Sequence, residues 1–145
     1  MILVDADLLL YAYHPGSERH PAARSWLESV LSGVEPVRFA WLTLWAFLRI
    51  STNPRVYERP LLAGEATEAV GSWLTRSTSG ILDPGERHWS ILEGLLAGDQ
   101  VRGPLIMDAV LAALALEHGA TLYTTDGDFA RFSGLKWRNP LGPVA

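Results

Sequence analysis

The chain lacks cysteine altogether, and lysine occurs only once among its twelve basic residues. Without cysteine there is no disulfide, no thiolate metal ligand and no cysteine nucleophile. Long hydrophobic runs are also missing, since no apolar segment reaches the roughly 20 residues that span a bilayer. The first residues do not form the basic stretch and apolar core of a signal peptide. We therefore expect a soluble, cytoplasmic protein without membrane contact.

The other eleven basic residues are arginines, although the net charge is −4. The negative charge argues against a general nucleic-acid coat. The planar arginine fork suits phosphate recognition, but a GC-rich coding bias explains arginine richness equally well. The 145 residues contain no repeat, low-complexity tract or long linker, so we expect one domain over 1–145.

Hydrophobic periodicity predicts strands that alternate with helices. This pattern is typical of an α/β domain, here with a central, mostly parallel sheet of about four to five short strands flanked by helices. We expect strands at 2–4, 37–40, from 81, at 122–125 and at 136–138. Helices are expected at 6–13, 21–31, 42–51, 65–75, from Asp83 to about 97 and at 108–117, with a helical turn at 128–132. Asp83 is the predicted N-cap of the fifth helix, with Pro84 and Glu86 in its first turn.

Acidic residues follow two of the predicted strands. Asp5 ends the first strand, and Asp126 follows a similar strand late in the chain. Ligands of open α/β sheets bind outside the carboxyl ends of the strands, so both carboxylates are expected at one site. Asp108, which opens the apolar helix, supplies a third. Carboxylates gathered without a lysine repel one another unless a cation neutralises them, so the pattern predicts an oxygen-ligand metal site.

Four segments in order resemble the PIN-domain ribonucleases, and in particular the VapC-type toxins of bacterial toxin–antitoxin pairs. They span most of the chain, and their order and spacing are more specific than any one of them. The segments are Val4-Asp5-Ala6-Asp7 with Leu8 to Tyr11, Phe47-Leu48-Arg49 running into Thr52-Asn53-Pro54, Asp108-Ala109, and Thr124-Thr125-Asp126-Gly127-Asp128-Phe129.

The resemblance implies a Mg²⁺- or Mn²⁺-dependent endoribonuclease that is commonly dimeric and is neutralised by a small antitoxin protein. A hard cation held by carboxylates can activate water and stabilise charge on a transferring phosphoryl group. The implied catalytic residues are Asp5, Asp108, Asp126 and Asp128, of which Asp5, Asp108 and Asp126 would be the metal ligands. Arg49 and Arg55, with Arg59 nearby, are candidates for contacts with RNA phosphates.

Three positions depart from the family pattern. Ala46 stands where the usual site has a glutamate, Asp7 where asparagine is usual, and Met107 where a small polar residue precedes the helix aspartate. We hypothesise that Asp7 is an auxiliary acid that restores the lost negative charge. The alternative is a weakened site in a protein that acts mainly by binding its antitoxin or RNA.

Other interpretations remain open for the same residues. Asp5 and Asp108 could serve only as helix caps, and Asp126-Gly127-Asp128 could be an ordinary turn. The Asp5-x-Asp7 pair also resembles the start of haloacid-dehalogenase-type phosphatases, although the only lysine, Lys136, follows the late acids instead of preceding them. The segment from Leu42 to Ile50 has more apolar bulk than one helix face needs, which suggests a contact with an antitoxin helix or a second protomer.

Overall fold

The structure is a computed structural model that describes residues 1–98 and 100–142. Within them the chain alternates strands and helices, as the sequence predicts. The strands are β1 (Ile2–Val4), β2 (Val37–Phe39), β3 (Ser79–Ile81), β4 (Thr121–Tyr123) and β5 (Trp137–Arg138). The helices are α1 (Ala6–Tyr13), α2 (His20–Leu31), α3 (Trp41–Ser51), α4 (Ala63–Leu74), α5 (His88–Leu95) and α6 (Leu105–His118), with a 3-10 helix η1 (Gly127–Arg131).

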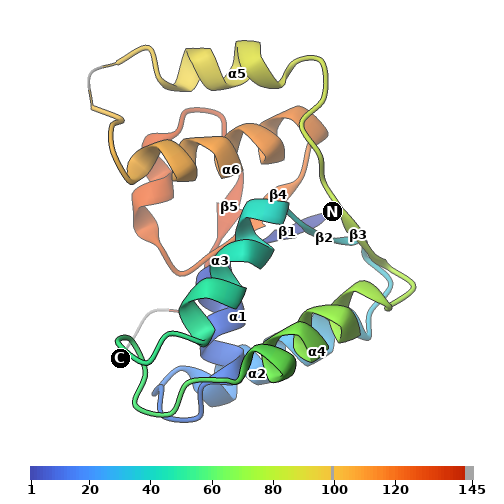
Figure 1. Ribbon diagram of the computed structural model, residues 1–145. Coiled ribbons are helices and arrows are strands. Elements are labelled where there is room, and N and C mark those ends of the chain that lie inside the picture. The colour runs from blue at the N-terminus through green and yellow to red at the C-terminus, as the bar shows by residue number, and fades with distance from the viewer. Residues whose placement is uncertain (99, 143–145) are drawn as a thin grey trace.

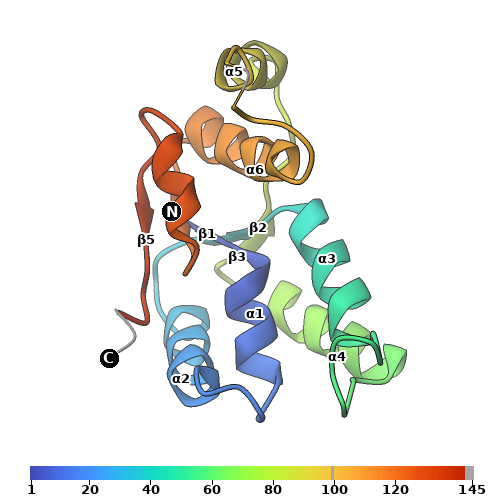
Figure 2. The ribbon, with the colours of Figure 1, turned by 90° about the vertical axis from the view of Figure 1, so that its left-hand side faces the viewer.

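The five strands form one sheet in the order β3-β2-β1-β4-β5, and all neighbouring pairs are parallel. The predicted α/β fold with a parallel sheet is therefore confirmed. The sheet lies between two helical layers: α1, α2 and α4 lie on one side, and α5 and α6 on the other (Figures 1 and 2). Because both faces are covered, the central strand β1 consists only of buried apolar residues.

Each face of the sheet has its own core. Ile2 and Val4 pack with α1 to α4, where Trp73 is buried and its ring stands edge-on to Phe47 with centroids 4.8 Å apart. Leu3 points to the other face and packs with α6, η1 and part of α5. This alternation along β1 follows from the two-residue period of strand side chains. Burial on both faces fixes the register of β1, and so the position of the residue that follows it.

The fifth helix begins later in the chain than the sequence predicts. It starts at His88, with Arg87 as N-cap, so the prediction that Asp83 caps it is wrong. The cause is a distant acceptor: the Glu117 carboxylate accepts hydrogen bonds from Gly85 N–H (2.8 Å) and Arg87 N–H (3.0 Å). Those bonds hold the preceding segment outside the helix, which a search for local capping signals cannot detect.

Helix α6 begins three residues before the predicted start. Pro104 is its N-cap and Asp108 lies in its first turn, so Asp108 neither opens nor caps the helix. The helix ends at Gly119, whose φ of +67° is the left-handed conformation that glycine adopts without strain. No helix in 1–98 and 100–142 is long and apolar enough to cross a membrane.

Candidate active site

The strand order reverses between β1 and β4. From β1 the chain moves outward through β2 and β3, and β4 then returns to the other side of β1. Residues that follow β1 and β4 therefore flank a topological switch point, where open α/β sheets place their ligand sites. Asp5 follows β1, and the segment from Thr124 to Asp128 follows β4. The predicted meeting of these acidic ends is thus produced by the topology.

Asp5 is fixed by both of its carboxylate oxygens. Oδ1 accepts a hydrogen bond from Ala6 N–H over 2.7 Å as the N-cap of α1, and Oδ2 accepts one from the Thr124 hydroxyl over 2.8 Å. The capping interpretation therefore holds for Asp5, but it uses only one oxygen. Burial, repulsion from Asp7 and, to a smaller extent, repulsion from Asp108 raise the Asp5 pKa to about 7, although the hydrogen bonds from Thr124 and Ala6 oppose the shift. The metal-free site therefore disfavours the ionised form of the Asp5 carboxyl group.

Asp7 ties α1 to the segment after β4. Its Oδ2 accepts hydrogen bonds from the Thr125 N–H over 2.9 Å and from the Thr125 hydroxyl. The Thr124 hydroxyl is 3.4 Å from the same oxygen, and Oδ1 accepts from Leu8 N–H over 2.7 Å. Asp7 therefore has a positioning role that its type and place alone did not reveal.

Asp108 faces the site from α6 and stays partly exposed. Its pKa is raised by burial first, and then by repulsion from Asp126 and Asp128, while Arg131 partly opposes the shift. Asp108 thus connects the acid at β1 with the acids after β4. Four carboxyl groups, those of Asp5, Asp108, Asp126 and Asp128, share one electrostatic environment.

The late acids form a capped turn. Asp126 is the N-cap of η1, where its Oδ1 accepts from Asp128 N–H over 2.9 Å, and its own N–H donates to the Thr124 hydroxyl over 3.0 Å. Asp128 is exposed, and its carboxylate is 3.9 Å from the Arg131 guanidinium. Asp126 therefore belongs to the same network as Asp5, whereas Asp128 lies at its edge.

The donor chemistry fits a hard divalent cation. The groups that repel one another are all carboxylates, and burial keeps solvent from screening Asp5. In the described parts of the chain no three acidic or histidine side chains are close enough together to hold a metal ion as they stand. The acids instead form a row in which each affects the next: Asp108 raises the pKa of Asp5, and Asp126 and Asp128 raise the pKa of Asp108. Mg²⁺ commonly takes only one or two protein carboxylates and keeps several waters, so such a row suits it.

Two threonines were missed by sequence reasoning. Thr124 is fully buried, and its hydroxyl joins Asp5 to the Asp126 backbone, while Thr125 holds Asp7. The sequence signal was the Thr124-Thr125 pair directly before Asp126. Both threonines belong to the strand predicted at 122–125, so neither was assigned to the site. Position 46 on α3 is partly exposed, and because it is an alanine it adds no carboxylate. Arg49 and Arg55 are exposed, and no contact places either beside the acids.

Comparison with known proteins identifies the family of this chain. The model of the PIN domain matches residues 2–135. Ribonuclease VapC37 of Mycobacterium tuberculosis is 41% identical over 140 residues, which cover 97% of each chain. Ribonuclease VapC33 of the same species is 38% identical over 141 residues, which cover 97% of this chain and 99% of the relative. The family match lends no support to the phosphatase interpretation.

Solved structures share the fold. The chain is similar to VapC20 of Mycobacterium tuberculosis, described as a sarcin-ricin loop cleaving toxin, with a TM-score of 0.68 at 20% identity, covering 93% of this chain and 96% of that one. It is also similar to VapBC2 of Rickettsia felis bound to a promoter DNA fragment, with a TM-score of 0.68 at 18% identity, covering 96% and 98%. Taken with the family match and the relatives over the whole chain, these likenesses mean that the chain belongs to the PIN-domain family, in its VapC group.

Proposed function

We propose that this protein is a metal-dependent endoribonuclease and the toxin of a VapBC-type pair, active in the cytoplasm. The observation that carries the proposal is the Asp5 carboxyl group, held between Ala6 and Thr124 with its pKa raised to about 7. Neighbouring acids and burial cause that shift, and a divalent cation would relieve it. The ribonuclease names of the relatives support RNA as the substrate.

One or two of the carboxylates of Asp5, Asp108 and Asp126 would hold the cation directly, and the remaining acids would hold its coordinated waters. When bound, the cation supplies a Lewis acid for the phosphoryl oxygens and lowers the pKa of a coordinated water. The chain's own contribution is positioning. Thr124 fixes the Asp5 carboxylate and the Asp126 backbone, and Asp7 fixes the Thr125 segment relative to α1. Exposed Asp128 is free to orient water at the edge of the site.

The direct test is cleavage of structured RNA by purified, partner-free protein. We expect cleavage with Mg²⁺ or Mn²⁺, none with EDTA, and a loss of at least about 100-fold in Asp5→Asn and Asp108→Asn, as expected when charge stabilisation is removed. Asp128→Asn should lose less, because its side chain is exposed. Equal cleavage by wild type and Asp5→Asn would indicate a contaminating nuclease. A folded wild type that neither cleaves RNA nor is stabilised by either metal would refute the proposal.

Ala46 supports a second candidate, a PIN-domain protein that binds its antitoxin or RNA with little turnover. This position carries no carboxylate, and its partial exposure leaves room for one. In Ala46→Glu we expect tighter Mn²⁺ binding and faster cleavage if the missing acid limits the site. Metal binding by the wild type without cleavage, together with cleavage by Ala46→Glu, would favour this second candidate.

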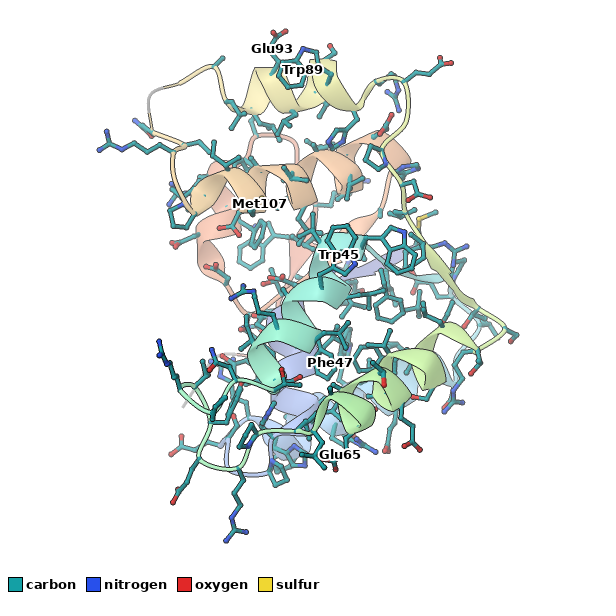
Figure 3. The ribbon with its side chains drawn as sticks, in the orientation of Figure 1. Trp45, Phe47, Glu65, Trp89, Glu93 and Met107 are labelled. Carbon is teal, nitrogen blue, oxygen red and sulfur yellow. The ribbon has the colours of Figure 1, made fainter. Side chains whose placement is uncertain are left out.

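A small antitoxin and a second copy of the chain are the proposed protein partners. Trp41 and Trp45 on α3 are 43% and 62% exposed, with ring centroids 6.4 Å apart, and Met107 on α6 is also exposed. Figure 3 shows Trp45 and Met107 among the side chains of this region. A protomer contact would bury this apolar surface. Light scattering should find a dimer for wild type and a monomer for Trp45→Asp; a dimeric Trp45→Asp would place the contact elsewhere.

A further inference from the structure

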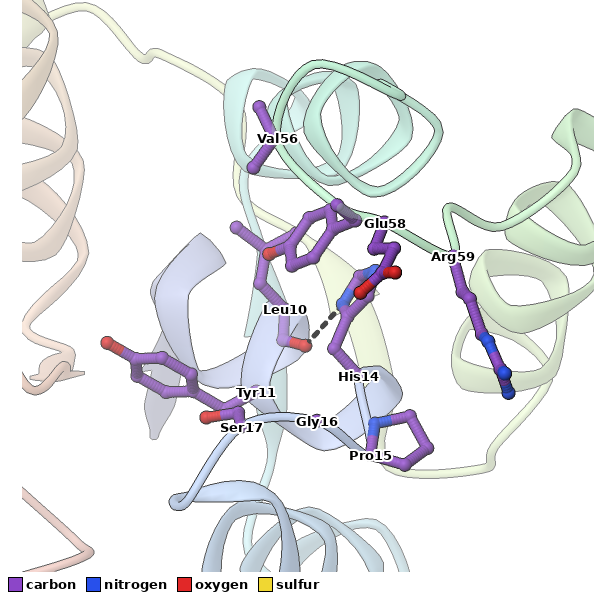
Figure 4. Close-up of a pocket in the computed structure, with 10 residues that line it drawn as sticks. Leu10, Tyr11, His14, Pro15, Gly16, Ser17, Val56, Glu58 and Arg59 are labelled. Atoms are coloured by element: carbon purple, nitrogen blue, oxygen red, sulfur yellow. Dashed lines mark hydrogen bonds between the residues drawn. The ribbon is translucent and has the colours of Figure 1, made fainter.

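A pocket of about 700 Å³ lies beside the C-terminal end of α1. One wall comes from α1 and the turn that follows it, and the other from the segment after α3 (Figure 4). Its main lining residues are Leu10, Tyr11, His14, Val56, Tyr57 and Arg59. None of these side chains takes part in the acidic network described above.

The pocket shares one face of α1 with the acidic site. Asp7, Leu10 and Tyr11 are spaced by three and four residues, which places them on one stripe of α1, and His14 is the C-cap directly after the helix. At 1.5 Å per residue, Leu10 and His14 lie about 4 to 11 Å along the helix axis from Asp7. Stacked nucleotides rise about 3.4 Å each, so a strand at the acids would reach the pocket within about three nucleotides.

The pocket offers flat aromatic surfaces. The His14 and Tyr57 rings stack with centroids 3.6 Å apart and planes 7° apart. His14 is only 5% exposed, and its Nδ1 is 2.8 Å from the Leu10 carbonyl oxygen, so Nδ1 donates and Nε2 is left as an acceptor. Among the described residues that buried Nε2 has no hydrogen-bond partner. Tyr57 is partly exposed, and buried His14 supports its ring from one side, so the other face of Tyr57 suits stacking by a nucleobase.

The charges around the pocket also suit a nucleic-acid strand. Arg59 lines it, and the Arg19 guanidinium lies 5.7 Å from the centre of the Tyr11 ring. Glu58 lines the pocket as well, and it faces solvent. Two arginines flank an aromatic floor, so both the base and the phosphate of one nucleotide find complementary groups.

We propose that this pocket binds one base of the RNA strand whose phosphodiester lies at the acidic site. The inference rests on the proposed function and adds a specificity element to it. The base stacks on the Tyr57 ring, which His14 supports from the other side, and Arg59 contacts the strand backbone. The pocket would therefore select which nucleotide stands a short distance from the cleaved bond.

The test measures binding of fluorescently labelled homopolymeric oligoribonucleotides to the Asp108→Asn protein, which leaves the RNA uncut. In this background Tyr57→Ala should weaken binding about 5- to 150-fold, the range expected for one lost stacking contact. Tyr57→Phe keeps the ring and should bind as before. Trp89→Ala removes an aromatic ring that is 67% exposed on α5 and serves as the matched control. An abasic strand of equal length should bind equally with and without Tyr57→Ala.

Several outcomes would overturn the inference. Unchanged RNA binding in a Tyr57→Ala protein with the wild-type melting temperature would exclude the base pocket, while metal-dependent cleavage by wild type would leave the proposed function intact. Loss of antitoxin binding without loss of RNA binding would assign the pocket to the protein partner. Failure of every oligonucleotide to bind, together with no cleavage by wild type, would overturn both proposals.

Discussion

The Thr124 hydroxyl donates a hydrogen bond to Asp5 Oδ2 over 2.8 Å, although the two residues are 119 positions apart. The Thr124 hydroxyl oxygen in turn accepts a hydrogen bond from the Asp126 N–H over 3.0 Å. One buried hydroxyl therefore connects the acid after β1 with the acid after β4. Together with the hydrogen bonds between Asp7 and Thr125, this side chain fixes the geometry at the switch point.

Thr124→Val should destabilise the protein by about 1 to 3 kcal/mol, because Asp5 Oδ2 and the Asp126 N–H both lose the hydrogen bond that Thr124 provides. Cleavage should fall as well, since the hydrogen bond also lowers the Asp5 pKa. Thr43→Val is the matched control: Thr43 is equally buried, and its hydroxyl has no partner in the described parts of the chain. Urea denaturation compares the two variants. Equal losses would mean that the Thr124 contacts contribute nothing.

The stability of the metal-free protein should depend on pH through Asp5. Its folded pKa is about 7 against 3.8 for the unperturbed group, so the folded state binds the proton more tightly. The contribution of Asp5 is therefore fully present below about pH 4 and is lost as pH rises to about 7. Thermal denaturation in EDTA should show a weaker decline over this range for Asp5→Asn. Mg²⁺ or Mn²⁺ should stabilise wild type most at the upper end.

Substitutions of Asp7 separate its hydrogen bonds from its charge. Asp7→Ala removes the acceptor of the Thr125 N–H and should cost about 1 to 3 kcal/mol of stability. Asp7→Asn keeps one carbonyl acceptor but turns its NH2 group toward either the Leu8 or the Thr125 N–H, so it should lose stability, though less than Asp7→Ala. If Asp7 compensates for Ala46, Asp7→Asn should also bind Mn²⁺ more weakly in calorimetry. Unchanged metal affinity and activity in Asp7→Asn would leave Asp7 a purely positioning residue.

Substitution of a buried and of an exposed tryptophan tests the packing of the core. Trp73 is 1% exposed and its indole N–H donates to the Tyr13 hydroxyl over 3.0 Å, whereas Trp89 is 67% exposed. Trp73→Ala should cost about 3 to 5 kcal/mol, as expected for a large buried aromatic. Trp89→Ala should change stability by about 0.5 kcal/mol or less. Chemical denaturation of both variants measures the difference, and a comparable loss in the two would contradict the packing described for α4.

The features that sequence reasoning could predict are those carried by local periodicity. Ile2 to Val4 is a short apolar run followed by an acid, and such a run at a strand end requires no distant information. The same holds for Asp126, because turn residues surround it. The parallel sheet followed from the alternation of helices and strands.

The features that were missed depend on partners far away in the sequence. Thr124 looks like an ordinary strand residue until β4 pairs with β1. The start of α5 was misplaced because Glu117, about 30 residues later, takes the N–H groups of Gly85 and Arg87. The tie between Asp7 and Thr125 is of the same kind. These three errors arose where a tertiary hydrogen bond replaced a local one.

The pairing of β1 with β4 also has a consequence for synthesis on the ribosome. Asp5 is made before its partner Thr124, which follows 119 residues later. At about 5 to 20 residues per second, a chain waits roughly 6 to 24 s between the two. A nascent or prematurely terminated chain therefore contains the first carboxylate without the second half of its site. Whatever chemistry the acids perform is withheld until the segment that follows β4 has been made.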